Sequence, residues 1–286
     1  MIPRLAVIGV GLIGGSFALD LKRQGRVERV IGAGRSRASL ERARELGLID
    51  EIAANAVDAV READLALLAT PVGVIPALLR EIAPHLPPAC IVTDAGSTKQ
   101  DVIAAARAAL GDKIGQFVPA HPIAGAETSG PEAARAGLYQ GKALILTPLP
   151  ENRPEDVQTV ANLWAACGAR VARMDAAQHD QVFAAVSHLP HLAAFALVDD
   201  LAHRPTAEAC FKYAGAGFRD FTRIAASSPE MWRDIALANR AALVGELDAY
   251  IAKLDEVRAL VASGDAEALL NLFTRASDER RNWKGG

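Results

Sequence analysis

The chain has 286 residues, of which 51% are hydrophobic and 23% are charged, enough to bury one large core or two medium ones. Its net charge of −3 excludes the basic surface with which proteins bind nucleic acids or anionic membranes. The three cysteines, Cys90, Cys167 and Cys210, form no CxxC or metal-binding spacing, so we expect reduced thiols and no metal site.

Strand and helix patterns alternate along the first part of the chain. Short apolar runs typical of strands in a buried parallel sheet lie at 4–10, 29–35, 64–70 and 90–96. Helix patterns lie at 12–24, 39–49, 73–83 and 99–110. Three more strand patterns, at 116–122, 142–148 and 169–174, accompany a helix at 155–168. This alternation predicts an α/β domain of the Rossmann type, with a doubly wound parallel sheet.

After Met174 the pattern changes to long helices with apolar periodicity, at 178–202, 228–264 and 266–283. We therefore predict a dinucleotide-binding domain over 1–174 and an all-helical domain over 175–286. Helices with wide apolar faces often bury them against a second copy of the chain. The sequence thus predicts a homodimer formed through the helical domain.

The sequence gives no reason to expect a signal peptide or a membrane span. The N-terminus runs directly into the first strand pattern. The longest apolar stretch, 65–79, is interrupted by Pro71 and Pro76. We expect a cytoplasmic protein that does not contact a membrane.

A glycine-rich loop follows the first strand pattern and precedes the first helix pattern. Gly9, Gly11 and Gly14 have the GxGxxG spacing, a weak signal alone but a specific one in this context. The first glycine permits a tight turn, the second lets a pyrophosphate approach, and the third lets helix and strand pack closely. We expect this loop, including Leu12 and Ile13, to bind a dinucleotide at the N-terminus of the helix.

The end of the second strand pattern indicates which dinucleotide is preferred. Chains that bind NAD usually carry an acid here for the ribose 2′-hydroxyl, but no acid lies between Glu28 and Glu41. Arg35, Ser36 and Arg37 are present instead, and such groups suit a 2′-phosphate. We predict a preference for NADP, with NAD also possible. Alternatively, the two arginines are solvated charges at the start of a helix.

The segment HPIAGAETSG, residues 121–130, supplies the candidate general base. His121 follows a strand pattern on the side of the sheet where such domains bind ligands. A histidine there can accept a proton from a hydroxyl as hydride leaves the same carbon. Its rate contribution should fall as the pH drops through its pKa. The segment DAGSTK places Ser97 and Lys99 at the end of a neighbouring strand pattern.

The helical part carries further polar candidates. SHLPH places His188 and His191 beside a proline, and Arg219 and Arg223, four residues apart, can face one anionic substrate. The remaining histidines, His85, His179 and His203, are predicted to be surface or structural residues.

These motifs together resemble the prephenate/arogenate dehydrogenase (TyrA) family. GVGLIGGS, DAGSTK, HPIAGAETSG, SHLPH and FRDFTRIAASSPEMWRDI occur in the family's order over essentially the whole chain. The resemblance implies NAD(P)-dependent oxidative decarboxylation of prephenate or arogenate in tyrosine biosynthesis, by a dimer with its active site between the domains. It does not distinguish the two substrates.

The resemblance also implies individual roles. His121 accepts the proton of the ring 4-hydroxyl, and Ser97 positions His121 and the hydroxyl. Arg223 binds the ring carboxylate. His191 lines the substrate pocket, and His188 and Arg219 are further substrate-binding candidates.

Two other functions remain open from the residues. One is another NADP-dependent oxidoreductase of this architecture, such as a β-hydroxyacid dehydrogenase or a pyrroline-carboxylate reductase. A β-hydroxyacid enzyme is expected to use a lysine of the helical domain, whereas the candidate here is a histidine of the first domain. The other is a non-catalytic dinucleotide sensor, which would make His121 and Ser97 dispensable.

Overall fold

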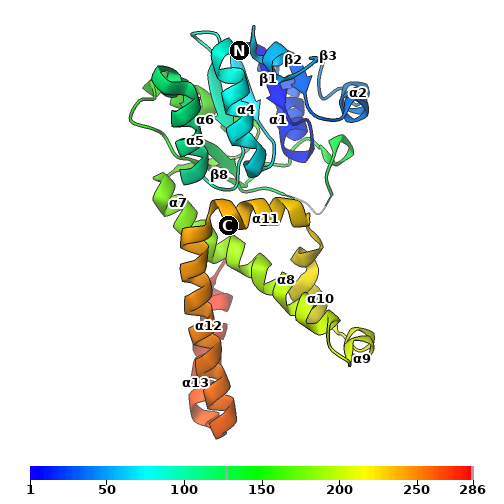
Figure 1. The fold of residues 1–286 in the computed structure, drawn as a ribbon, viewed down its shortest axis with the longest axis vertical. Helices are drawn as coiled ribbons and strands as arrows, with labels where there is room; N and C mark the ends of the chain where they lie inside the picture. The colour runs from blue at the N-terminus through cyan, green and yellow to red at the C-terminus, as the bar shows by residue number, and fades with distance from the viewer. Residues whose placement is uncertain (126–127, 285–286) are drawn as a thin grey trace.

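The structure is a computed structural model that describes residues 1–125 and 128–284. A sheet-containing part forms one end of the molecule, and helical arms extend from it at the other (Figure 1). The main sheet has six parallel strands in the order β3-β2-β1-β4-β5-β6. The strands are β1 (Ile2–Ile8), β2 (Val27–Ala33), β3 (Glu51–Ile52), β4 (Leu65–Leu68), β5 (Ile91–Asp94) and β6 (Phe117–Val118).

Helices cover both faces of this sheet. They are α1 (Leu12–Arg23), α2 (Arg37–Glu45), α3 (Ala56–Val60), α4 (Ile75–Ile82), α5 (Gln100–Leu110) and α6 (Pro154–Ala166), with short 3-10 turns η1 (Val72–Val74), η2 (Ala83–His85), η3 (Gly111–Gln116) and η4 (Pro131–Ala133).

The central strand β1 shows why its sequence is a continuous apolar run. Leu5 and Val7 join the core that includes α1 and α6, while Ala6 and Ile8 join the core on the opposite face. All four side chains are buried, because both faces of the strand are covered. The Rossmann-type fold predicted from the sequence is confirmed.

The last three strands form a second, smaller sheet rather than extending the first. The strands are β7 (Ala120–Pro122), β8 (Ala143–Leu146) and β9 (Arg170–Arg173). β8 pairs with β7 antiparallel and with β9 parallel. Pro119 separates β6 from β7 and has no N–H to donate, so the pattern at 116–122 divides into two strands. The change of sheet places His121 on β7, away from the parallel ladder.

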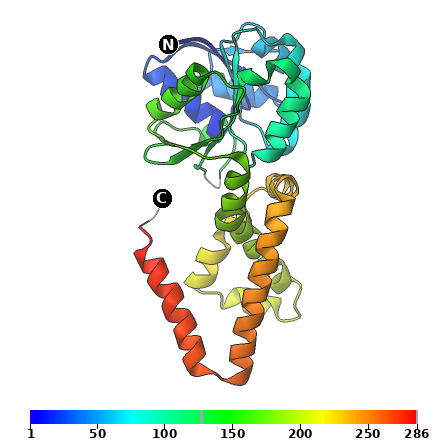
Figure 2. The same ribbon diagram turned by 90° about the vertical axis from the view of Figure 1, so that its left-hand side faces the viewer.

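The helical part begins just after β9. It contains α7 (Ala176–Phe183), a π-helical turn η5 (Ala184–His188), α8 (Leu189–Ala202), α9 (Ala207–Lys212), α10 (Ala216–Thr222), the 3-10 turn η6 (Arg223–Ala226), α11 (Pro229–Ala238), α12 (Arg240–Ser263) and α13 (Ala266–Asn282). The segment predicted as one helix at 228–264 breaks at Asn239, between α11 and α12. Figure 2 shows α12 and α13 as the two arms of a V, which meet at the left-handed Gly264.

The helical part has little core of its own. Its own apolar cluster is small: Trp232 and Ile235 are buried against Val72 of η1, with Leu192, Phe195 and Ala238 packed around them. The stretch Ala176–Ala202 is long and apolar enough to cross a membrane by length and composition alone, and only 22% of its most apolar window is buried in the described chain. Both observations mean that these helices leave much apolar surface uncovered in a single copy of the chain.

Candidate active site

The glycine loop has the geometry that a dinucleotide requires. Gly9 has φ 98°, and a Cβ there would lie 2.4 Å from the carbonyl oxygen of Ala69. A Cβ on Gly14 would lie 2.3 Å from the carbonyl oxygen of Gly9. Around Gly11 the nearest atom to a Cβ, the amide nitrogen of Gly130, is 3.9 Å away, so the backbone is open to a ligand. The loop therefore fits a pyrophosphate bound at the start of α1.

A residue that follows β7 in the chain, Tyr139, stabilises the first turn of α1 next to this loop. Gly11 is the N-cap of α1 and provides no side chain to bind the first amides of the helix, which contains Leu12 and Ile13. The Tyr139 hydroxyl donates to the carbonyl oxygen of Ile13 at 2.6 Å. Because these contacts fix the loop without using its first amides, those amides stay available for a phosphate.

The three polar residues after β2 have different surroundings. The Ser36 hydroxyl accepts a hydrogen bond from the amide of Ser39 at 3.2 Å and caps α2. Arg37 donates from Nε to Glu41 at 2.9 Å, along the exposed side of the same helix. Arg35 lies between the end of β2 and this cap and is exposed. Of the three, Arg35 is the one whose side chain is not engaged by the start of α2.

His121 lies at the contact between the two parts of the chain. Its Nδ1 is 2.9 Å from Nε2 of His179 on α7, and the ring edge of Phe183 packs against it with 5.0 Å between ring centroids. Nδ1 of His179 is in turn 2.8 Å from Oδ1 of Asp180. Of the two predictions for His179, a surface or a structural residue, the structure excludes the surface position, because the ring is fully buried against the candidate base.

Asp180 joins α7 to the sheet part. Its carboxylate oxygens accept hydrogen bonds from the amides of Lys99 and Gln100, each at 2.8 Å, at the start of α5. The start of a helix carries unpaired amides and a partial positive charge, so it favours a carboxylate. This contact fixes α7, and with it His179, against the strand that carries His121.

A buried ion pair fixes the same strand from the other side. Lys99 and Asp94 are fully buried and paired, and Nζ of Lys99 also donates to the carbonyl oxygen of Ala120 at 3.0 Å. Oδ1 of Asp94 accepts from the amide of Ala120 at 3.0 Å. Both polar groups of Ala120 are therefore bound, directly before His121.

Ser97 lies half-buried in the loop between Asp94 and Lys99. The loop therefore brings Ser97 to the same end of β5 that supports His121. Among residues 1–125 and 128–284, no hydrogen bond joins the Ser97 hydroxyl to His121, so its contact with that ring stays a prediction.

The two histidines of SHLPH face different partners. His188 ends the π-helical turn, is buried, and accepts a hydrogen bond at Nδ1 from Nδ2 of Asn239 at 3.1 Å. The same amide donates to the backbone carbonyl of Asp180 at 2.7 Å. His191 stacks on Trp232, with ring centroids 3.6 Å apart and planes inclined by 21°. π-Helical turns often occur at functional sites, and this one carries His188 inward.

Arg223 lies at the start of η6, one residue after α10 ends, while Arg219 is on α10 itself. Both are exposed. The positive charge of Arg223 contributes to lowering the pKa of His191, which places the two groups in one electrostatic neighbourhood. Trp232 connects His191 to His188, because its ring centroid lies 3.6 Å from that of His191 and 6.1 Å from that of His188. The site thus runs from His121 through His188 and His191 to Arg223.

Burial keeps these histidines neutral. It lowers the pKa of His121 well below 6.5, helped by the nearby charges of His179, Lys99 and His188. Burial also lowers the pKa of His179, and that of His188 to about 4. Burial acts to raise the pKa of Asp180, but the hydrogen bonds from His179 and the two amides outweigh it, so the carboxyl stays ionised. A neutral His121 can accept a proton at physiological pH.

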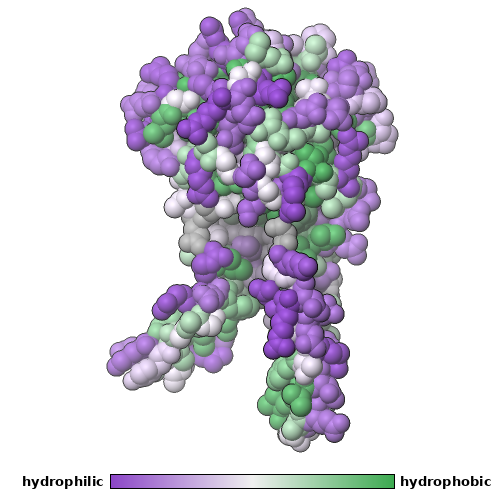
Figure 3. Space-filling view, turned by 180° about the vertical axis from the view of Figure 1, so that it is seen from behind, coloured by the Kyte–Doolittle hydropathy of each residue, from purple (hydrophilic) through white to green (hydrophobic). Residues whose placement is uncertain are grey.

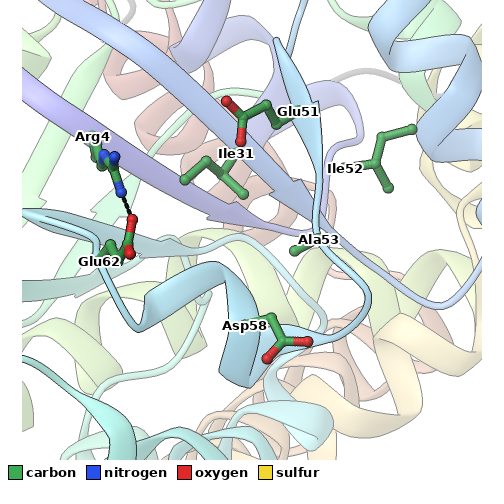
Figure 4. Close-up of a pocket in the computed structure, with 7 residues that line it drawn as sticks. All are labelled: Arg4, Ile31, Glu51, Ile52, Ala53, Asp58 and Glu62. Atoms are coloured by element: carbon green, nitrogen blue, oxygen red, sulfur yellow. Dashed lines mark ion pairs between the residues drawn. The ribbon is translucent and has the colours of Figure 1, made fainter.

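One hollow on the surface lies away from this cluster. It is lined by Arg4, Ile31, Glu51, Ile52, Ala53, Asp58 and Glu62, at the β3 edge of the sheet (Figure 4). Arg4 is near the amino end of β1 and pairs with Glu62, which precedes β4. Ligands of such sheets bind at the carboxyl ends of the strands, so this hollow is not the expected site.

Comparison with known proteins agrees with the arrangement of the two parts. Residues 17–173 match the family described as "Prephenate dehydrogenase, nucleotide-binding domain". Residues 175–275 match the one described as "Prephenate dehydrogenase, dimerization domain". The chain belongs to the prephenate dehydrogenase family. The first match begins after the glycine loop, so the loop is an independent sign of dinucleotide binding.

Relatives within the prephenate dehydrogenase family are similar over nearly the whole chain. The cyclohexadienyl dehydrogenase of Zymomonas mobilis is 38% identical over 96% of this chain and 94% of its own. The prephenate dehydrogenase of Bacillus subtilis is 38% identical over 96% of this chain and 75% of its own.

Solved structures of the family have the same fold. The A. aeolicus prephenate dehydrogenase, in complex with hydroxyphenyl propionate and NAD+, has a TM-score of 0.92 and 36% identity, covering 98% of each chain. The Synechocystis arogenate dehydrogenase has a TM-score of 0.81 and 30% identity, covering 97% of this chain and 99% of its own. A Plasmodium falciparum pyrroline carboxylate reductase reaches only 0.51 at 11% identity, a likeness of fold alone.

Proposed function

We propose that this chain oxidises and decarboxylates prephenate or arogenate in tyrosine biosynthesis, with NAD(P) as the hydride acceptor. The observation that carries the proposal is the contact between the two parts of the chain at His121, which meets His179 of α7. Asn239 and Trp232 connect His188 and His191 to the same place. Arg223 is close enough to His191 to lower the pKa of that ring. The site combines a neutral base with a fixed cation, as oxidation of an anionic hydroxy compound requires.

The proposed reaction breaks two bonds of the substrate ring. Hydride leaves the carbinol carbon, the ring carboxylate leaves as CO2, and the electrons of that C–C bond complete the aromatic ring. A dinucleotide bound at the glycine loop would supply the nicotinamide that accepts the hydride. His121 takes the 4-hydroxyl proton as hydride leaves and returns it to the oxygen of the aromatic product, so the reaction releases no net proton.

The other residues bind and orient the substrate. Arg223 binds the ring carboxylate, and Ser97 orients His121 and the hydroxyl. His191, held over Trp232, lines the pocket together with His188. Arg219 offers a second cation on α10. Most of the rate then comes from holding the carbinol carbon against the nicotinamide.

The comparison that tests this proposal is a steady-state assay with prephenate and arogenate, each with NAD and NADP. We expect turnover with at least one of the two substrates and none with 3-hydroxyacids. We also expect a higher kcat/KM with NADP, because Arg35 stands where an acid would repel the 2′-phosphate. Arg35→Ala should lower kcat/KM for NADP by about tenfold, because it removes one charged hydrogen bond to the 2′-phosphate. The value of kcat/KM for NAD should fall much less.

Two outcomes would contradict these assignments. Turnover of 3-hydroxyacids, or dinucleotide binding without turnover of either ring substrate, would reject the proposed function. Equal effects of Arg35→Ala on both dinucleotides would reject the assignment of Arg35 to the 2′-phosphate. Arg258→Ala, at an exposed site on α12, is the matched control.

We also propose a domain boundary between Met174 and Asp175, and a homodimer formed by the helical domain in the cytoplasm. Except for Met1, Leu46 and Val74, every exposed large hydrophobic side chain of the described residues lies after residue 175. Most of them lie on the two projections formed by α8–α10 and by α12–α13, where Figure 3 shows apolar patches. A second copy covering these arms would supply the core that the helical part lacks.

The dimer should be visible in sedimentation. We expect twice the chain mass of 30.1 kDa at micromolar concentration. Leu270→Glu with Phe273→Glu should produce monomers, because both side chains lie exposed on α13 and would bury charge in the interface. Leu46→Glu, on the sheet part, should leave the dimer intact. A wild-type chain that sediments as a monomer would contradict the proposal.

A further inference from the structure

The hydrogen bonds around His121 form an ordered series that begins at an ionised carboxylate. Asp180 is acceptor-only, and Oδ1 receives the Lys99 amide while lying 2.8 Å from Nδ1 of His179. His179 must therefore carry its proton on Nδ1 to bond with Asp180. Since burial keeps this ring neutral, its Nε2 has no proton and can only accept.

The same reasoning fixes the next ring. Nε2 of His179 lies 2.9 Å from Nδ1 of His121, so Nδ1 of His121 must carry the proton that joins them. His121 is itself neutral because it is buried. Its Nε2 is then the nitrogen without a proton, which is the form that a general base needs.

We propose that His179, oriented by Asp180, is a positioning residue that fixes the tautomer of His121 and leaves Nε2 of His121 as the free base. This proposal rests on the proposed function, because it assigns a role within that reaction. Neither residue reaches the reacting atoms, so each acts through the ring of His121. The ring of Phe183 completes the enclosure and offers no competing acceptor.

Two features indicate more than a structural contact. The helical part supplies His179 and Asp180. His121 and the amides of Lys99 and Gln100, which donate to Asp180, belong to the sheet part. The base therefore acquires its correct tautomer only when α7 is docked on α5. The other charged groups that face the cluster, Lys99 and Asp94, are paired with each other and bind Ala120.

The first test observes the tautomer directly and needs no substrate. Nitrogen-15 NMR of histidine-labelled enzyme distinguishes a protonated ring nitrogen from a bare one, and His→Gln variants assign each signal. We expect Nδ1 protonated and Nε2 bare in both His121 and His179. In His179→Leu, Nδ1 of His121 loses its acceptor, and the Nε2-protonated form should appear. A wild-type His121 protonated on Nε2 would overturn the proposal.

The second test separates positioning from packing by kinetics. His179→Leu keeps the bulk but removes the acceptor, and we expect kcat to fall by about 10²-fold with KM little changed. His179→Gln can place an amide oxygen near the former Nε2, and kcat should recover to within about tenfold of wild type. His203→Leu and His203→Gln are matched controls, since His203 is an exposed ring of α8 bonded to its own helix.

The two tests also separate this proposal from the proposed function. If neither ring substrate is turned over, the proposed function is rejected. The NMR measurement still shows whether His179 and Asp180 set the tautomer of His121. If turnover occurs and both His179 variants lose kcat equally, the ring contributes packing alone and the proposal is overturned. If His179→Leu retains wild-type kcat, it is overturned as well.

Discussion

Replacing His121 with alanine should lower kcat by about 10²- to 10⁴-fold, the usual contribution of a positioned general base, while KM for the ring substrate changes by less than about threefold. The proton that His121 accepts moves only in the transition state, so the loss falls on turnover rather than on binding. Steady-state kinetics of the variant with prephenate or arogenate measure both parameters. His203→Ala, at the exposed end of α8, is the control.

The pH profile gives an independent check on His121. Below its pKa the imidazole is protonated and cannot accept the hydroxyl proton, so kcat/KM, which reports the free enzyme, falls on the acid side. Burial lowers that pKa well below 6.5, so the wild-type fall should lie well below pH 6.5. A fall in kcat/KM centred at pH 6.5 or above, or a rise in KM as large as the fall in kcat for His121→Ala, would remove His121 from this role.

The sequence predicted those parts of the site that depend on local spacing. Gly9, Gly11 and Gly14 act within one turn between a strand and a helix, and the structure gives each the steric environment expected of it. The alternation of strands and helices likewise predicted the doubly wound parallel sheet. These features are readable from sequence because neighbouring residues determine them.

The residues that support the base could not be found in this way. His179 is separated from His121 by 58 positions, and nothing adjacent in sequence distinguishes it from an ordinary helix histidine. Its role appears only when Asp180 docks on the amides of Lys99 and Gln100, a contact across 80 residues or more. Asn239 gave no signal either, because only the break between α11 and α12 turns it toward His188.

The prediction of a 2′-phosphate site stays a prediction, and the structure shows what else its three residues bind. Arg35, Ser36 and Arg37 were grouped because each type suits a phosphate. In the structure the Ser36 hydroxyl caps α2 and Arg37 pairs with Glu41 one turn along, as polar residues at a helix start commonly do. Contacts within α2 therefore engage Ser36 and Arg37. The NADP proposal is tested at Arg35, which makes no such contact.

Replacing Arg223 with alanine should raise KM for the ring substrate by about 10²-fold, because a bidentate, charged hydrogen bond between arginine and carboxylate contributes roughly 2–3 kcal/mol. Turnover should fall less. The carboxylate loses its negative charge as it leaves as CO2, so a cation binds it more tightly in the ground state than in the transition state and does not speed its loss. Arg223 therefore acts by binding and orienting the substrate. Arg223→Lys keeps the charge but loses the planar fork, and KM should recover only in part.

The same variant tests the placement of Arg223 without any substrate. Burial lowers the pKa of His191, its hydrogen bond to the Ser187 carbonyl opposes this, and the positive charge of Arg223 lowers it further. Removing that charge should therefore move the His191 titration to higher pH, measurable by NMR of the labelled ring. Arg258→Ala should leave both KM and this titration unchanged. If Arg223→Ala shifts neither, the guanidinium does not share a site with His191, and the carboxylate must be bound by another cation.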